Sequence, residues 1–122
     1  MKDIKISKII EYIVNLNVVW NRVYFWQPIN EPNQDYITIN IISEQQPRYN
    51  KGTLLEFAFL GGTERTTFNT LLGYRLSISN NITWPKTWFD CYWVNEDGWF
   101  INWYDDKNRK VVKQDYRFYF VK

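Results

Sequence analysis

Apolar side chains near the start of the chain recur at the spacing of a helix. Within residues 4–16 they repeat every three or four positions, at Ile6, Ile9, Ile10, Ile13 and Val14. This repeat gathers them on one face, so we expect an amphipathic helix over 4–16. Asp3 is a suitable N-cap, because its carboxylate can accept a hydrogen bond from a free backbone N–H. Isoleucine and valine also favour strands, and a strand is therefore the alternative for this segment.

Three strands are then predicted, two of them from the alternation of side chains between the two faces of a strand. A short strand covers 22–27 and stops before Pro28, and a loop rich in proline and asparagine follows over 28–35. Residues 36–42 (YITINII) alternate clearly, which is typical of a half-buried strand. After a polar loop, residues 53–60 alternate again and end at two glycines. We expect 36–42 and 53–60 to form an antiparallel pair.

A second helix is predicted after the two glycines. Either Thr63 or Thr66 can cap its first turn, since a threonine hydroxyl can accept a hydrogen bond from a free N–H. Apolar residues recur at helical spacing from there to about Ser79. The pair Asn80-Asn81 is expected to end this helix.

The last third of the chain predicts three more strands, which cover 87–94, 98–104 and 114–122. A hairpin turn is expected at 95–98, where Gly98 can adopt a positive φ, and a charged turn at 105–110. The complete order is α-β-β-β-α-β-β-β. It predicts an α+β fold with two helices and a mixed, mainly antiparallel sheet. A chain of this length supports one core, so 1–122 is expected to be a single domain.

Aromatic residues are unusually frequent, and their placement limits the function. The chain of 122 residues has 9 Tyr, 8 Phe and 7 Trp, and more than half of these follow residue 83. Strand alternation places aromatics on both faces of the last three strands. A one-sided platform for stacking bases or sugars would leave one face aliphatic. A sheet with one face packed against helices and the other against a neighbouring subunit fits this pattern better. Core, protein interface and ligand surface all stay open as roles for these aromatic residues.

Several absences narrow the chemistry. The sequence has no His and a single Cys, Cys91, which excludes imidazole catalysis, an intrachain disulfide and the usual zinc centres. The net charge of +2 is too balanced to indicate nucleic acid. No signal peptide or membrane-spanning run is expected. We therefore expect no enzyme activity, cofactor, metal, membrane contact or specific nucleic acid.

The acidic pairs and the cysteine also have structural interpretations. Glu96-Asp97 and Asp105-Asp106 fall in the expected turns, where acidic residues are common for turn chemistry. Cys91 falls within an expected strand and has no histidine to activate it, so we expect a buried core thiol. Neither acidic pair is assigned a catalytic role.

One local motif supplies a resemblance. Residues Arg22 to Ile39 read R-V-Y-x(3)-P-x(3)-P-x(2)-D-Y-I-T-I, after an expected helix and before an expected strand and helix. Over residues 4–79 this resembles the tail terminator (tail completion, minor tail) proteins of long-tailed bacteriophages and related phage-like particles. In that family a short helix leads to an RVY-like strand, a proline loop and a strand beginning PY or DYI.

The resemblance implies a structural role without catalytic residues. Such proteins form a ring, usually hexameric, on the head-proximal end of the tail tube, where the ring stops tube polymerisation and faces the head connector. The implied partners are further copies of the chain, the tail tube protein and the head–tail connector protein. The implied location is the virion tail, after assembly in the host cytoplasm.

Two polar loops are candidates for contacts with other rings, because loops on a rigid scaffold commonly carry such contacts. The candidate residues are Arg48, Tyr49 and Lys51 in the first loop and Asp105, Asp106, Lys107 and Arg109 in the second. Solvated connections without a partner are the alternative for both loops.

Two other functions compete with the tail terminator. The first is a small binding module whose aromatic sheet stacks single-stranded nucleic acid or glycan. The second is a phage-encoded inhibitor or another small interaction protein, for which the sequence offers no motif.

Overall fold

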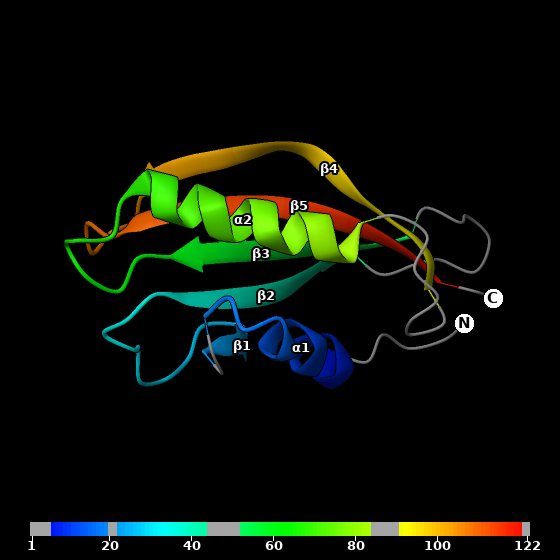
Figure 1. Cartoon of the computed structure of the whole chain (residues 1–122), viewed down its shortest axis with the longest axis horizontal. Coiled ribbons are helices and arrows are strands. Elements are labelled where there is room, and N and C mark those ends of the chain that lie inside the picture. Colours follow the sequence, from blue (N-terminus) through cyan, green and yellow to red (C-terminus); the bar gives the residue numbers. More distant parts are fainter. Residues whose placement is uncertain (1–5, 20–21, 44–51, 84–90, 121–122) are drawn as a thin grey trace.

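The computed structural model describes residues 6–19, 22–43, 52–83 and 91–120. Its elements are, in chain order, α1 (Ile6–Asn15), β1 (Val23–Phe25), β2 (Tyr36–Ser43), β3 (Thr53–Leu60), α2 (Phe68–Ile82), β4 (Cys91–Tyr104) and β5 (Lys110–Phe120). The five strands form one sheet in the order β1-β2-β3-β5-β4 (Figure 1). Only β1 and β2 are parallel, and the other neighbours are antiparallel. The α+β class and the antiparallel pairing of β2 with β3 are thereby confirmed.

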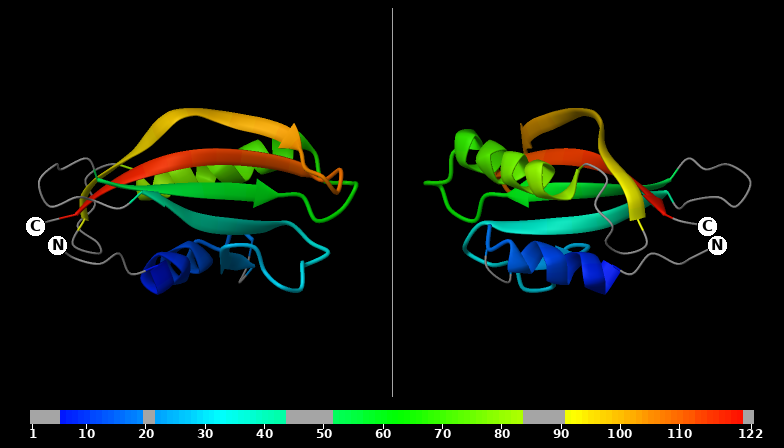
Figure 2. Two further views of the ribbon diagram at one scale, coloured as in Figure 1. Left: turned by 180° about the vertical axis from the view of Figure 1, so that it is seen from behind. Right: turned by 45° about the vertical axis from the view of Figure 1, so that its right-hand side comes forward.

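Both helices contribute to one core on the same face of the sheet. The helix α2 lies across β3, β5 and β4, whereas α1 packs beside β1 (Figures 1 and 2). The core side chains of α1 are Ile9 and Ile13, and α2 adds Leu71, Ile78 and Ile82. They meet the sheet residues Ile37, Ile39, Leu55, Phe57, Phe59, Val112, Tyr116 and Phe118. Complete burial of one such side chain contributes about 1.5–3 kcal/mol to the free energy of unfolding.

The bounds of α2 differ from the expectation at both ends. Thr67 caps the helix, accepting a hydrogen bond at 3.2 Å from the backbone N–H of Thr70. The sequence-based choice of Thr63 or Thr66 is therefore wrong, and Thr66 is engaged elsewhere. The expected end at Asn80-Asn81 is also wrong, since both residues lie within the helix, which continues to Ile82. Burial of Ile82 in the core favours the extra turn.

Asp35 connects three parts of the fold. Its Oδ1 accepts hydrogen bonds from the backbone N–H of Gly62 at 2.9 Å and from Thr66 Oγ1 at 2.5 Å. Its Oδ2 accepts one from the Tyr74 hydroxyl at 2.8 Å, and burial together with this carboxylate raises the pKa of Tyr74 to about 12. Arg22 Nε donates to the backbone oxygen of Asp35 at 2.7 Å. The arginine and the aspartate of the motif therefore fix the proline loop against α2.

The strand β4 is one continuous element, although the sequence predicts two strands joined by a turn at 95–98. Its 14 residues all run beside β5. Gly98, at φ 80°, lies in a bulge where residues 98–100 oppose Gln114 alone. The polar run Asn95 to Asp97 pairs residue by residue with β5, and two ion pairs add to this contact, Arg75 with Glu96 and Arg117 with Asp97, each at 3.1 Å. The expected hairpin is therefore wrong because tertiary contacts outweigh local turn preference.

A second shift of register in β4 changes which residues are buried. Strand alternation places Cys91 and Trp93 on one face and Val94 on the other. The structure instead buries Cys91 and Val94, while Trp93 is exposed, because the pairing with β5 shifts between residues 91 and 93. The expected burial of the Cys91 thiol is confirmed, and that burial raises its pKa. In β5 the alternation holds, since Tyr116 and Phe118 are buried.

Candidate functional site

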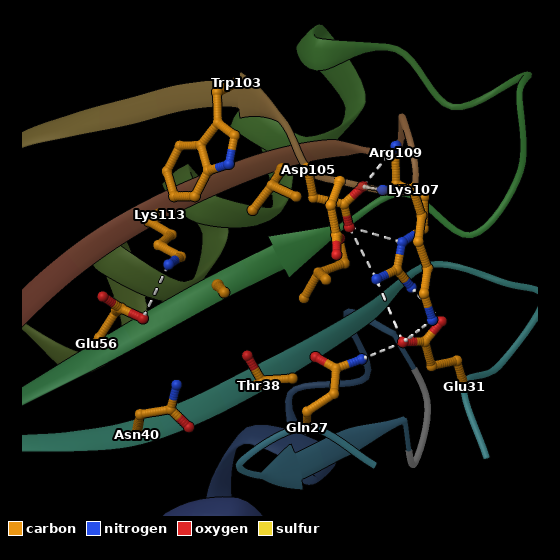
Figure 3. A pocket seen from close by; sticks show the side chains of 14 residues that line it. Gln27, Glu31, Thr38, Asn40, Glu56, Trp103, Asp105, Lys107, Arg109 and Lys113 are labelled. Atoms are coloured by element: carbon orange, nitrogen blue, oxygen red, sulfur yellow. Dashed lines mark hydrogen bonds and ion pairs between the residues drawn. The ribbon is translucent and has the colours of Figure 1, made fainter. Parts of the chain in front are cut away.

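A polar cleft lies on the face of the sheet opposite the helices, at the end formed by the β4–β5 hairpin (Figure 3). Its volume is about 430 Å³. Charged, amide, small and apolar side chains line it: Gln27, Glu31, Thr38, Asn40, Glu56, Ala58, Leu60, Trp103, Asp105, Asp106, Lys107, Arg109, Val111 and Lys113. A cleft of this size is within the range of small-ligand sites.

The hairpin turn at residues 105–109 is organised by one carboxylate. Asp105 Oδ1 accepts hydrogen bonds from the backbone N–H groups of Lys107 at 3.0 Å and Arg109 at 2.8 Å. The backbone N–H of Asp105 also donates to the oxygen of Arg109 at 2.9 Å. Asn108 adopts φ 61°, a conformation that asparagine tolerates in turns. The expected charged turn is confirmed, and Asp105 stabilises it by accepting hydrogen bonds from two of its backbone N–H groups.

Arg109 joins this turn to the proline loop. Its Nε and Nη2 lie 2.9 and 2.8 Å from Asp105 Oδ2, and its Nη1 lies 2.9 Å from Glu31 Oε2. The same Nη1 donates to the Tyr36 hydroxyl at 2.8 Å. The Arg109 side chain is only 19% exposed, so these contacts are partly shielded from water. One guanidinium therefore holds residues that lie more than 70 positions apart in the chain.

Lys107 completes the network from the solvent side. Its Nζ lies 2.9 Å from Glu31 Oε1, and its side chain is 59% exposed. The hydrogen bond from Lys107 and the charge of Arg109 outweigh burial and lower the pKa of Glu31. Burial favours the neutral form of Asp105, yet hydrogen bonds from Arg109 outweigh it, and the pKa of Asp105 is also lowered. Both carboxylates are therefore ionised at neutral pH.

The other wall of the cleft combines an ion pair with an aromatic ring. Lys113 Nζ lies 3.4 Å from Glu56 Oε1 and 4.5 Å from the centre of the Trp103 ring. The ammonium group therefore occupies one face of the indole, where a base or sugar would otherwise stack. On the floor, the buried Asn40 Oδ1 has no hydrogen-bond partner among the described residues.

The structure brings the four candidate residues of the second loop into one hairpin. Asp105 and Arg109 face inward and hold the turn, whereas Asp106 and Lys107 are exposed. Their contact with another protein stays a prediction. The three residues of the first loop, Arg48, Tyr49 and Lys51, lie outside the described residues.

Sequence reasoning missed the partners that complete the cleft. The proline loop supplies Glu31 and Gln27, and the sheet supplies Glu56 and Lys113. These two pairs come from segments that are far from the hairpin in the sequence, and no local pattern connects those segments with it. The one signal available for the cleft was the alternation of side chains along β4. It correctly places Ile101 and Trp103 on one face of the strand and Asn102 on the other.

The chemistry of the cleft is that of ion pairing. A general acid near neutral pH needs a raised carboxyl pKa, whereas the pKa values of Glu31 and Asp105 are lowered. Across the described residues, no three His, Cys, Asp or Glu side chains are placed to hold a metal ion. The described helices include none that is long and apolar enough to cross a membrane. The cleft can hold and orient polar groups of a partner through its charged rim.

A scan against protein-family models and a search of curated proteins both find no match to this sequence.

Proposed function

We propose that this protein is a tail-terminator-like structural subunit, which forms a ring on the head-proximal end of a phage tail tube and joins the tube to the head connector. It acts without catalysis, cofactor or metal, and its partners are further copies of itself, the tube protein and the connector protein. It belongs to the virion tail and assembles in the host cytoplasm.

The agreement between the motif and the fold carries this proposal. A helix, a short strand, a proline loop, two antiparallel strands and a second helix follow one another in the order that the resemblance implies. Within the motif, Arg22 and Asp35 make the contacts that close the proline loop. Two residues of the motif therefore have a structural role in this fold, which supports the proposal.

The hairpin at 105–109 is the proposed contact with a neighbouring ring. Asp105 and Arg109 fix its backbone, so that Asp106 and Lys107 are presented to solvent at a defined place. A rigid hairpin loses little conformational entropy when it binds, which favours a specific contact between rings. Its exposed charges would set the register between rings more than the total affinity.

Tail tubes assembled from the cognate tube protein provide the test. Added protein should cap them, so that tubes stop lengthening and electron micrographs show a ring at one end. The double variant Asp106→Ala and Lys107→Ala should weaken capping or joining to the connector by about tenfold, as loss of a specific polar contact does. The matched control is Lys8→Ala and Glu11→Ala, which removes an exposed pair of opposite charges from α1.

Two results would contradict the proposal. A protein that stays monomeric alone and fails to bind tubes at any concentration is not a tail terminator. Capping that is equally strong in the hairpin variant and the control would remove the hairpin from the interface, while the ring-forming role would stand.

A further inference from the structure

We propose that the free edge of β4, over residues 101–104, adds an extended strand from another protein to this sheet, with a carboxylate of that strand meeting Lys110. The inference goes beyond the ring-forming function and does not depend on it. It follows from open backbone groups along one side of β4, from exposed apolar side chains beside them, and from a lysine without an acidic partner.

The two edges of the sheet differ in how far they are open to a further strand. β1 has three residues and is followed by Trp26 at φ 63° and by Pro28, which interrupt an extended strand. β4, at the other edge, has 14 residues (Figures 1 and 2). Its first part carries Glu96, Asp97 and two shifts of register, features that block edges. Residues 101–104 pair regularly with β5 and carry no charge, so this part of the edge is open.

The backbone groups of Asn102 and Tyr104 face away from the sheet. In an antiparallel pair, residues alternate between those whose N–H and C=O face the neighbouring strand and those whose groups face the other side. At the end of the hairpin the N–H of Asp105 donates to the oxygen of Arg109 at 2.9 Å, so residue 105 faces β5. Along the regular pairing that follows, Trp103 also faces β5, and the N–H and C=O groups of Asn102 and Tyr104 are turned outward.

The pairing of β5 with β3 supports this assignment. Lys110 is the partner of Tyr104 in the register, and its backbone oxygen accepts a hydrogen bond from the N–H of Gly61 at 2.9 Å, on the β3 side. Lys110 therefore faces β3 and leaves the backbone of Tyr104 free. Outside the ladder with β5, the described residues make no backbone hydrogen bond to Asn102 or Tyr104. The occupant that matches such a row of main-chain groups is an extended chain.

Exposed apolar side chains flank the open groups on both faces of the sheet. Ile101 is 61% exposed and lies on the helix-free face with Trp103. Tyr104 is 53% exposed and lies on the helix side, where its ring centre is 5.3 Å from that of Phe68. An added strand with apolar side chains would cover these surfaces, and their removal from water favours association.

Lys110 indicates the charge of the added strand. Its Nζ lies 5.7 Å from the centre of the Tyr104 ring, and no carboxylate of the described residues lies within ion-pair distance of it. Side chains directly opposite each other in an antiparallel pair lie on the same face. A glutamate opposite Tyr104 would therefore lie beside the phenol ring and reach the free ammonium group. The partner strand is acidic at this position.

The same charge favours another protein over a second copy. β1 contains no carboxylate, and residues 99–104 of β4 contain none either, so neither described edge of this sheet supplies the acidic strand. Pairing of residues 101–104 from two copies would leave both Lys110 side chains without a carboxylate. The edge therefore matches a strand from a different chain.

A synthetic peptide provides the probe. When the capped hexapeptide Thr-Glu-Val-Thr-Ile-Thr pairs antiparallel with β4, its glutamate lies opposite Tyr104 and its central threonine opposite Asn102. NMR spectra of the isotope-labelled full chain should show shifts centred on residues 101–104 and slower hydrogen exchange of the Asn102 and Tyr104 amides. The peptide with lysine in place of glutamate should bind about threefold more weakly, as loss of an exposed ion pair predicts.

Blocked amides test the main-chain contact. N-methylation of the glutamate and the central threonine removes the two peptide N–H groups that face β4, and it should weaken binding at least about tenfold. N-methylation of the valine and the isoleucine removes N–H groups that face away, so this matched control should bind like the unmodified peptide. In the protein, Asn102→Pro removes an outward N–H and should also weaken binding about tenfold, whereas Asn102→Ala should not.

Contrary results would overturn the inference and leave the ring-forming function untouched. An unmodified peptide that shifts no resonance of residues 101–104 at millimolar concentration excludes strand addition at this edge. Equal binding of the two methylated peptides excludes the main-chain contact, whether or not Asn102→Pro folds. Equal binding of the glutamate and lysine peptides overturns the acidic partner. A wild-type dimer in sedimentation velocity that Asn102→Pro abolishes and Asn102→Ala retains would assign the edge to a second copy instead.

Discussion

Arg109 shows how a single residue connects parts of this fold that are distant in sequence. Its guanidinium contacts Asp105 within its own hairpin and Glu31 in the proline loop. The lowered pKa values of both carboxylates agree with this pairing. Arg109 therefore stabilises the hairpin through contacts within the protein.

Replacing Arg109 should therefore destabilise the protein. Arg109→Ala leaves the partly buried Asp105 without its main partner and Glu31 without one of its partners, and we expect the free energy of unfolding to fall by about 1–3 kcal/mol. Denaturant unfolding measures this loss. Lys107→Ala is the control, because its exposed ion pair contributes about 0–1 kcal/mol. Equal stability of Arg109→Ala and wild type would show that the network contributes nothing to folding.

Three neighbouring strands carry acidic residues in one row on the helix-free face. Asp115 in β5 is the direct neighbour of Glu56 in β3 and of Asp97 in β4. Lys113 and Arg117 flank the row, and each is paired with one of the outer carboxylates. Burial, with the charges of Glu56 and Asp97, raises the pKa of Asp115. This row follows from strand pairing, which no single segment reveals.

The raised pKa of Asp115 predicts how stability depends on pH. The folded protein binds this proton more tightly than the unfolded chain, so ionised Asp115 lowers stability at neutral pH, and the penalty disappears as pH falls through its folded pKa. Asp115→Asn should therefore raise the free energy of unfolding by about 0.5 kcal/mol at pH 7. Thermal unfolding at neutral and acidic pH measures the difference, which should vanish in acid. A variant that is less stable than wild type at pH 7 would contradict this explanation.

The whole molecule is built around one sheet, in which the three N-terminal strands lie beside the C-terminal β4–β5 hairpin. β3 pairs with β2 on one side and with β5, from the C-terminal part of the chain, on the other. Unfolding of either half would expose the β3–β5 pairing that joins the two. This arrangement supports the sequence-based expectation of a single domain, which stays a prediction.

A single domain should unfold in one cooperative step. Tryptophan fluorescence reports mainly on residues 84–103, where five of the seven tryptophans lie, and far-ultraviolet circular dichroism reports on all helices and strands. Their transitions in denaturant should coincide. Two separated transitions would instead indicate that the β4–β5 hairpin is an independent unit.

Local periodicity determined most of the elements of this protein. The alternation of Ile37 and Ile39 placed β2, and the burial of Tyr116 and Phe118 followed from the same rule in β5. The turn at 105–109 followed from its run of charged residues. These features depend on neighbours in sequence, because side-chain direction repeats every two residues along a strand.

Only the tertiary structure decided the rest. The run Asn95 to Gly98 favours a turn locally, yet Asn95, Glu96 and Asp97 pair with β5 and stay within β4. The partner of Arg109 in the proline loop, Glu31, has no local signal at all. The sequence alone therefore predicted the class of fold and the hairpin of the candidate site. The bulge that exposes Trp99 and the cleft both depend on contacts between segments far apart in the sequence. Local patterns cannot show that such segments meet.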